Sequence, residues 1–100
     1  MDNVKAADGF SAMGSRSRLE VLRALVRAGP GGLLVGDLQK RTGIAASTLA
    51  HHLKTLTTAG LLVQEKQGRA VINRANFDHL ASLAQFILHE CCIDEGENND

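Results

Sequence analysis

The sequence has few aromatic residues and no long apolar run, and each shortage narrows the classes of protein to consider. Its 100 residues include three Phe, no Trp and no Tyr, so we expect an aliphatic core. No apolar stretch approaches the roughly 20 residues that a membrane-spanning helix needs. The N-terminus, MDNVKAADGF, lacks the basic region and apolar run of a signal peptide. We therefore expect one cytoplasmic domain with no membrane partner.

Cysteine is also scarce, and its placement argues against a structural zinc site. The two cysteines are the adjacent Cys91 and Cys92, with no further cysteine at zinc-ligand spacing. In a reducing compartment both are expected to be free thiols. The sequence also lacks an evident nucleophile–base pair or paired carboxylates. The glycines at 29–32 precede neither the lysine nor the helix signature of a nucleotide loop. We therefore expect that the protein is not an enzyme.

Basic residues are absent from the last quarter of the chain, although the formal net charge is zero. All 11 Lys and Arg lie between Lys5 and Arg74, and residues 1–75 hold five acids, so this part carries a net charge of +6. Residues 76–100 hold the other six acids and no base, which gives −6. A basic body with an acidic tail suits phosphate contact on one side. A solvated surface with an acidic terminus explains the charges equally well.

Turn and cap residues divide the chain into helices and one hairpin. Ser15 and Asn76 are suitable N-caps, and the Gly-Pro-Gly-Gly segment at 29–32 ends a helix. The pattern predicts helices over residues 1–13, 15–29, 34–41, 45–59 and 76–92, strands over 61–66 and 70–74, and a turn at 67–69. On the second helix the residues expected to face inward are Leu19, Leu22, Leu25 and Val26.

The last predicted helix, over residues 76–92, is apolar on more than one side. Its main stripe consists of Leu80, Ala84, Ile87 and Cys91. Phe86 lies well round the other side. Such a helix is usually buried by more than its own domain, so we expect it to contact a second subunit. The acidic residues 94–100 are expected to form a disordered tail.

Residues 34–60 contain two short predicted helices joined by a tight turn at Thr42-Gly43. On the second of them, Leu49, Leu53 and Leu56 face inward. The outer face consists of Ser47, His51, Lys54 and Thr58. It offers hydrogen-bonding groups and a cation but no carboxylate, which suits the major groove of DNA. The alternative is an ordinary solvated face, although such faces usually carry Glu as well as Lys.

Polar residues near the hairpin and a histidine pair on the preceding helix complete the candidate surface. The hairpin carries Lys66, Gln67, Arg69 and Arg74. A basic hairpin beside two such helices can reach the DNA backbone or the flanking minor groove, although solubility alone explains Lys66. His52 lies on the flank of the core face and is expected to make a structural hydrogen bond. Adjacent histidines on one helix cannot share a metal, so zinc is not expected there.

These segments together resemble the ArsR/SmtB family of winged helix-turn-helix repressors. The resemblance rests on AMGSRSRLEVLRAL, on LLVGDLQKRTGIAASTLAHHLKTLTTAGLLVQEKQGRAVINR and on the closing amphipathic helix, and it covers roughly residues 6–92. It implies a mainly α fold with a small β-hairpin, in the order α-α-α-α-β-β-α. It also implies a homodimer joined through its first and last helices. Residues 1–93 would be the DNA-binding and dimerisation domain, before the tail at 94–100.

The resemblance further implies that the helix Ala46–Thr58, here called the reader helix, contacts double-stranded operator DNA. The residues expected at the DNA are Ala46, Ser47, Thr48, His51, Lys54 and Thr58 on this helix, and Gln67 and Arg69 on the hairpin, or wing. Two reader helices about one turn of DNA apart would meet a pseudo-palindromic operator. Ala45 replaces the usual serine before the reader helix, which should weaken its N-cap.

Members of this family are typically displaced from DNA by a metal ion, a metalloid or a reactive sulfur species. Two familiar effector sites do not match this sequence. Leu34-Val35-Gly36 stand where many arsenic-sensing relatives carry Cys-Val-Cys. The residues Asp78, His79, His89 and Glu90 lack the spacing of the zinc and nickel pattern on the last helix.

The remaining candidate effector site is Cys91-Cys92, because other arsenic-sensing relatives place a vicinal pair near the end of the last helix. Two thiolates are soft ligands for trivalent arsenic, as arsenite or methylarsenite, or for antimonite, and no obligatory cofactor is expected. Adjacent helical residues diverge by about 100°, so both sulfurs could reach one atom only if the helix end loosened.

Three alternatives to metalloid sensing stay open. Cys91 is on the apolar stripe, where it would be an inert core residue. The pair could instead respond to oxidation or reactive sulfur. The winged helix could also be a protein-interaction module without an inducer.

Overall fold

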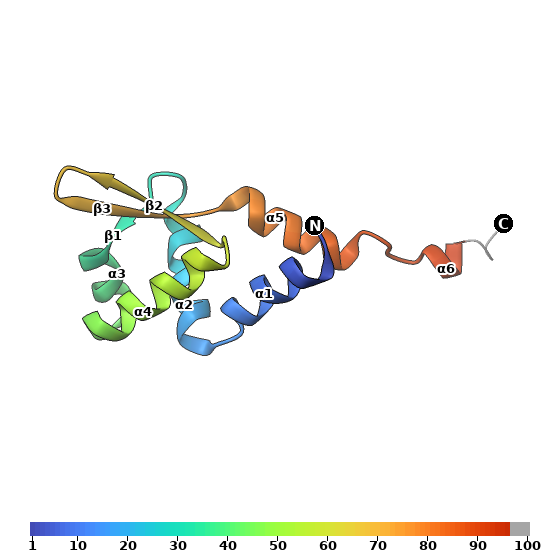
Figure 1. Cartoon of the computed structure of the whole chain (residues 1–100), viewed down its shortest axis with the longest axis horizontal. Coiled ribbons are helices and arrows are strands. Elements are labelled where there is room, and N and C mark those ends of the chain that lie inside the picture. Colours follow the sequence, from blue (N-terminus) through green and yellow to red (C-terminus); the bar gives the residue numbers. More distant parts are fainter. Residues whose placement is uncertain (97–100) are drawn as a thin grey trace.

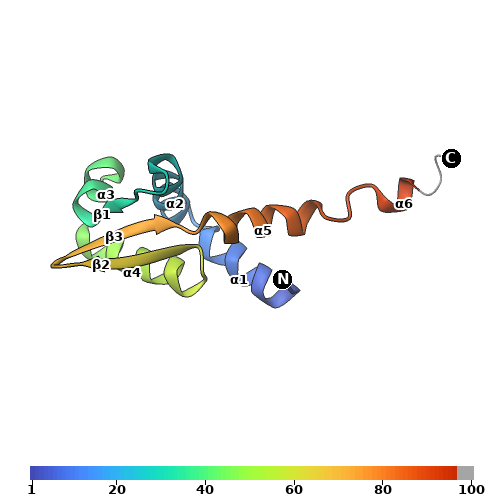
Figure 2. The same cartoon turned by 90° about the horizontal axis from the view of Figure 1, so that it is seen from above.

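Helices make up most of the protein, which a computed structural model describes over residues 1–96. The elements are α1 (Asn3–Met13), α2 (Arg16–Ala28), β1 (Leu33–Leu34), α3 (Val35–Thr42), α4 (Ala46–Thr58), β2 (Leu62–Gln67), β3 (Ala70–Ala75), α5 (Phe77–Leu88) and α6 (Ile93–Gly96). This order confirms the predicted α-α-α-α-β-β-α arrangement, with β1 and α6 as additions. The molecule measures 59 × 23 × 22 Å because α5 and α6 extend beyond the body (Figures 1 and 2).

Local residues set the helix ends. The hydroxyl of Ser15 accepts a hydrogen bond from the backbone N–H of Arg18 at 3.4 Å, and the Asn76 side chain accepts from His79 N–H at 3.2 Å, so both predicted N-caps are confirmed. Gly43 ends α3 in the left-handed conformation, with φ of 71°. Ala45 gives α4 no side-chain cap, as the sequence predicts.

The hairpin belongs to a three-stranded antiparallel sheet, in the order β1-β3-β2. The two long strands confirm the predicted hairpin, but the expectation of only two strands is wrong. Leu33 pairs with Asn73 and Leu34 with Ile72. A two-residue strand is too short to show the alternation that identifies strands in a sequence. The fully buried Asn73 supports this pairing by donating from its side chain to the Leu33 carbonyl at 3.3 Å.

The core is aliphatic, as expected, and lies where α2, α3 and α4 meet the sheet. Its fully buried leucine and valine side chains are Val21, Leu25, Leu38, Leu49, Leu56, Leu61, Leu62 and Leu83. The predicted inner face of α2 is partly wrong, because Leu19 and Val26 are each 42% exposed and Val21 is buried instead. The reason is that α2 is packed against α1, α3, α4 and β3 together, and these neighbours select its buried side.

α1 packs closely on α5 through small residues. Ala6, Gly9 and Ala12 are its buried positions. A Cβ atom at Gly9 would lie only 2.9 Å from Cδ1 of Leu83, so glycine allows the two helices to approach. This contact places α1 along α5, and Met1 and Asn3 at the N-terminal end of α1 line a depression together with Ile87 near the end of α5.

The C-terminal part differs from the prediction. α5 ends at Leu88, whereas the sequence pattern continues it through Cys92. Phe86, expected on the opposite side from the main stripe, packs against the core. The short helix α6 occupies part of the predicted disordered tail; the rest of that tail, 97–100, lies outside the described residues. Among the described helices none is long and apolar enough to cross a bilayer.

Candidate DNA-binding surface and effector site

The reader helix coincides with α4 and presents one face to solvent. Leu49, Leu53 and Leu56 bury its inner face against the core. The predicted DNA contacts Ala46, Ser47, Thr48, His51, Lys54 and Thr58 are all exposed. Within this set there is no acid, so an approaching duplex meets hydrogen-bonding groups and a lysine. The surface meets the chemical requirements for reading base edges in the major groove.

The turn before α4 is fixed by a threonine. The Thr42 hydroxyl donates to the Leu38 carbonyl at 2.7 Å and accepts from the Ile44 N–H at 3.3 Å. With Gly43 in the left-handed conformation, these bonds set the direction in which α4 leaves α3. The geometry is therefore that of a helix-turn-helix.

The wing contains both free and occupied polar side chains. Gln67 donates to Glu65 at 2.9 Å, and Arg74 forms an ion pair with the same carboxylate at 2.6 Å. The Gln67 hydrogen bond, and then the Arg74 hydrogen bond and charge, lower the pKa of Glu65. Arg74 also donates to the Pro30 carbonyl at 2.8 Å, so it braces the sheet. Arg69, beside the Gly68 turn, is exposed and has no hydrogen-bond or ion-pair partner among the described residues.

The two histidines of α4 differ as expected in exposure but not in bonding. His51 is exposed on the outer face. His52 is partly buried, and its Nδ1 is buried without a hydrogen-bond partner, so the expected structural hydrogen bond is wrong. Burial, followed by the charges of Arg18 and His51, lowers the pKa of His52. This shift favours the neutral imidazole beside the reader face.

The cysteines lie beyond α5 in a turn. The Cys91 N–H donates to the Leu88 carbonyl at 2.8 Å, and Cys92 adopts a left-handed conformation with φ of 64°. Cys91 and Cys92 are both exposed, and their sulfurs are 3.2 Å apart. The alternative that Cys91 is a core residue is thus wrong, and so is the expectation that a helix through Cys92 must loosen before both sulfurs can reach one atom. The left-handed residue turns the chain so that the two side chains meet.

Hydrogen bonding to Cys92, with a smaller effect of desolvation, raises the pKa of the Cys91 thiol. A ligand that binds both sulfurs must therefore displace that proton. No three His, Cys, Asp or Glu side chains among residues 1–96 come together in a group that could hold a metal ion. The described residues thus gather no such set from Asp78, His79, His89 and Glu90, and the candidate donors just beyond α5 are the thiols of Cys91 and Cys92.

Sequence reasoning missed a groove lined with arginines. In the sequence, Arg16, Arg23 and Arg27 lie toward the side of the second helix opposite its predicted inner face, and the structure places them with Arg41 of α3 around one depression. Their spacing in the sequence gives no such signal, because Arg41 comes from a different helix. Only the packing of α3 on α2 brings it near.

The helix-turn-helix, the adjoining wing and the outward polar face of α4 define a winged helix-turn-helix protein. The profile of a family described as "Helix-turn-helix domain" matches residues 13–65. The chain is 34% identical over 79 residues to the HTH-type transcriptional regulator NmtR of Mycobacterium tuberculosis, which covers 79% of this chain and 63% of NmtR. It is 40% identical over 59 residues to a candidate arsenical resistance operon repressor, ArsR2, of Halobacterium salinarum, covering 59% and 49%.

A solved structure is also similar. The ArsR-like transcriptional regulator from Rhodococcus sp. RHA1 superimposes with a TM-score of 0.78 at 25% identity, over 95% of this chain and 86% of that one. The chain belongs to the ArsR/SmtB family of winged helix-turn-helix transcriptional regulators. It spans 63% of the length of NmtR and 49% of the length of ArsR2.

Proposed function

We propose that the protein is a homodimeric repressor that binds operator DNA through α4 and is released when a trivalent arsenic or antimony species binds Cys91 and Cys92. The observation that carries the effector assignment is the 3.2 Å separation of two exposed sulfurs just beyond α5. The acid-free outer face of α4 carries the DNA assignment. The resemblance to ArsR2, a candidate arsenical resistance repressor, supports the effector class.

The sulfur separation suits a pyramidal centre. If each thiolate lies about 2.3 Å from the bound atom, as in known thiolate sites, two thiolates at a right angle are about 3.3 Å apart. The observed 3.2 Å is close to that value. A tetrahedral ion would spread the same sulfurs to about 3.8 Å and would require further ligands. Methylarsenite needs two sulfurs, whereas arsenite needs a third from a small thiol or a second subunit.

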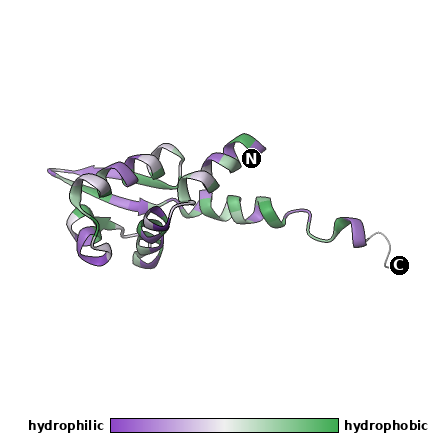
Figure 3. Ribbon diagram, turned by 90° about the horizontal axis from the view of Figure 1, so that it is seen from below, coloured by the Kyte–Doolittle hydropathy of each residue, from purple (hydrophilic) through white to green (hydrophobic). Residues whose placement is uncertain are grey.

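The exposed end of α5 supports the homodimer. Ile87 and Leu88 are each 64% exposed, and Val4 of the neighbouring α1 is 72% exposed. Figure 3 shows α5 as a largely hydrophobic ribbon that extends from the body. Apolar side chains gathered on two adjacent helices favour burial against the same surface of a second copy. The dimer would also set the distance between the two reader helices.

The position of the thiols provides a route from effector to DNA. Cys91 and Cys92 follow directly on the exposed turns of α5 that we assign to the dimer contact. An effector bound there changes the charge and the backbone of the chain at the edge of that contact. A small change in the packing of the two subunits then alters the spacing of the reader helices and weakens operator binding.

A second candidate function uses the same pair. Two exposed thiols at 3.2 Å are also placed for bridging by one or more sulfur atoms after reaction with a polysulfide. Mass spectrometry after polysulfide treatment tests this function. A mass increase that corresponds to a sulfur bridge between Cys91 and Cys92, together with loss of DNA binding, supports it. Unmodified thiols remove it.

The effector assignment is tested by release of DNA. An operator selected by the protein from random duplexes is labelled, and its fluorescence anisotropy is followed during titration. We expect release by methylarsenite at the lowest concentration, release by arsenite when a small thiol is present, and release by antimonite. Zinc and cadmium should not release the DNA at comparable concentrations. Release by zinc alone, with no response to any arsenical, would contradict the proposal.

The reader assignment is tested at the cation of the outer face. Lys54→Glu places a carboxylate where base edges and phosphates lie, so operator affinity should fall at least tenfold, or by about 1.4 kcal/mol. Anisotropy at fixed salt measures the affinity. Lys5→Glu makes the same charge change on the exposed surface of α1 and should leave affinity near wild type. Equal losses in the two variants would show a general charge effect and no reader role for α4.

The dimer is tested at Ile87. An Ile87→Asp variant places two carboxylates in the symmetric contact and removes two apolar side chains, each worth about 1.5–3 kcal/mol when buried. The dimer dissociation constant should rise by roughly two to four powers of ten. Analytical ultracentrifugation across concentration measures it. Val63→Asp alters an apolar residue of similar exposure on β2, 47% exposed, and should leave the dimer intact.

A further inference from the structure

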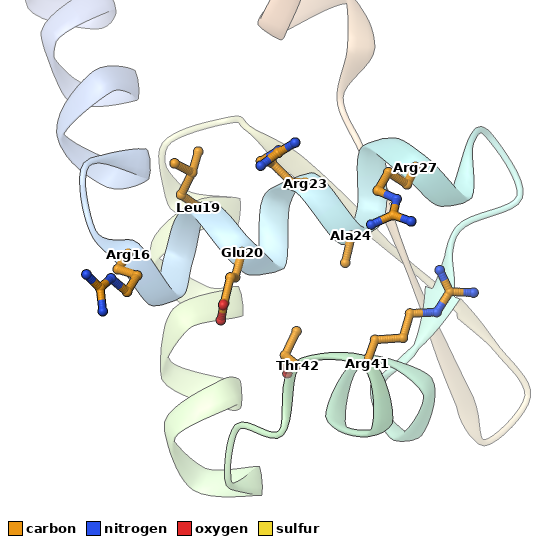
Figure 4. A pocket seen from close by; sticks show the side chains of 8 residues that line it. All are labelled: Arg16, Leu19, Glu20, Arg23, Ala24, Arg27, Arg41 and Thr42. Atoms are coloured by element: carbon orange, nitrogen blue, oxygen red, sulfur yellow. The ribbon is translucent and has the colours of Figure 1, made fainter.

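A groove between α2 and α3 brings together four arginines of the basic body. Its volume is about 720 Å³, and Arg16, Arg23 and Arg27 of α2 line it together with Arg41 of α3. Glu20 is the one acid at its edge, and the apolar Leu19 is also part of the wall. Figure 4 shows Arg27 and Arg41 extending to the same end of the groove and Arg16 at the other.

None of these four arginines has an ion-pair or hydrogen-bonding side-chain partner within residues 1–96. The contrast with Arg74 is informative, because its guanidinium is occupied by Glu65 and the Pro30 carbonyl. All four groove arginines are exposed. Four guanidinium groups around a single depression repel one another, and a ligand with several negative charges would relieve that repulsion.

The residue type indicates what kind of anion the groove takes. All four cations are arginines, whose planar forks bind phosphate or carboxylate through two parallel hydrogen bonds. The depression is open along its length and its arginines are exposed, which suits a surface that presents successive anions. A duplex presents a phosphate on each strand about every 3.4 Å along its axis.

The position of the groove selects the partner. Arg41 and Thr42 lie at the end of α3, directly before the turn at Gly43 that leads into α4. In a helix-turn-helix the N-terminal residues of the second helix contact base edges in the major groove. That groove is about 12 Å wide and is bounded by two phosphate backbones. Arg41, close to the start of α4, is therefore next to a backbone when α4 lies in the major groove, and the α2 arginines line the same depression as Arg41.

We propose that this arginine groove binds the sugar–phosphate backbone of the DNA beside the base pairs contacted by α4. This inference rests on the proposed function, since it needs α4 to bind DNA. The groove gives the protein a set of sequence-independent contacts that orient α4 before any base is read. The arginine groove and Arg69 of the wing together explain how a chain of zero net charge can bind DNA through its basic residues 1–75.

The test compares salt dependence on a random-sequence duplex of about 30 base pairs, near three helical turns. Each lost phosphate contact reduces the slope of log affinity against log salt by about 0.9. In an Arg27→Ala/Arg41→Ala variant the slope should be smaller in magnitude by about 1.8. When salt is raised from about 50 to 200 mM, the loss of affinity of this variant should therefore be roughly 12-fold smaller than the loss shown by wild type. Lys5→Glu changes the total charge by the same amount outside the groove and should keep the wild-type slope.

The outcomes separate the two proposals. If wild type binds no duplex, the proposed function fails and this inference fails with it. If wild type binds and the double variant keeps its slope and affinity, the groove does not bind DNA and the proposed function stands. A parallel experiment at constant ionic strength uses poly-glutamate to test whether the groove binds an acidic peptide. If wild type binds poly-glutamate, the double variant does not, and the salt slope for DNA is unchanged, the groove is assigned to an acidic peptide and the DNA assignment is wrong. Thermal melting of each variant verifies folding.

Discussion

Replacing both cysteines by serine should abolish the release of operator DNA by methylarsenite. The Cys91→Ser/Cys92→Ser variant keeps the size and exposure of both side chains but removes both soft ligands, and hydroxyl groups do not bind trivalent arsenic strongly at neutral pH. Its DNA affinity should stay within about twofold of wild type, because exposed substitutions usually change the free energy by about 0.5 kcal/mol or less. The measurement is operator anisotropy during an arsenical titration.

Single variants and a control sharpen this result. Cys91→Ser and Cys92→Ser each leave one thiol, so each should need at least tenfold more methylarsenite for half-release. Ser82→Ala alters an exposed residue on the preceding helix, α5, and should respond as wild type does. If the double serine variant still releases DNA at the wild-type concentration, the effector does not bind this pair and the site lies elsewhere.

Gly32→Ala should be the most destabilising of the substitutions considered. Gly32 has φ of 70°, a conformation that costs an L-residue about 1–2 kcal/mol. An added Cβ would also meet the Asn73 carbonyl and would lie 2.8 Å from Cγ of Arg74 and 2.9 Å from Cγ2 of Ile72. Because the carbonyl is part of the β1–β3 pairing, relief requires β1 to move away. We expect a loss of about 3–5 kcal/mol, a large part of the total for a domain of this size.

The neighbouring glycine provides the control. A Cβ at Gly31 would meet no atom within 4 Å, and Gly31 is not among the residues with positive φ. Gly31→Ala should therefore change the free energy of unfolding by no more than about 0.5 kcal/mol. Urea unfolding followed by circular dichroism measures both variants. Similar stabilities for the two would show that β1 is not held against β3 as tightly as the structure indicates.

The helix-turn-helix could be predicted because its signals are local. Leucines at helical spacing, the glycine after Thr42 and the polar outer positions all lie within one stretch of about 25 residues. The same holds for the caps at Ser15 and Asn76, where one side chain bonds a backbone group three residues later. The wing follows from two alternating segments around Gly68. These features need no knowledge of distant parts of the chain.

The inner face of α2 could not be predicted fully, because several positions on the helix are apolar. Leu19 and Val26 satisfy the helical period as well as Val21 does. The choice depends on four neighbours that contact α2 at once, and their positions are set by the whole fold. The strand β1 is a similar case, since its two residues become a strand only when β3 lies beside them.

The end of α5 shows most clearly what tertiary structure decided. Apolar residues up to Cys91 continue the helical period, so the sequence pattern predicts a helix as far as Cys92. In the folded chain α5 ends at Leu88, and its last two side chains, Ile87 and Leu88, are each 64% exposed. Cys92 then takes a left-handed conformation, and the sulfurs come to 3.2 Å. The sequence alone determined the helix-turn-helix and the wing and singled out the adjacent cysteines as the candidate effector site, since these depend on neighbours along the chain. The meeting of the two thiols and the arginine groove depended on packing and backbone conformation, which no local pattern encodes.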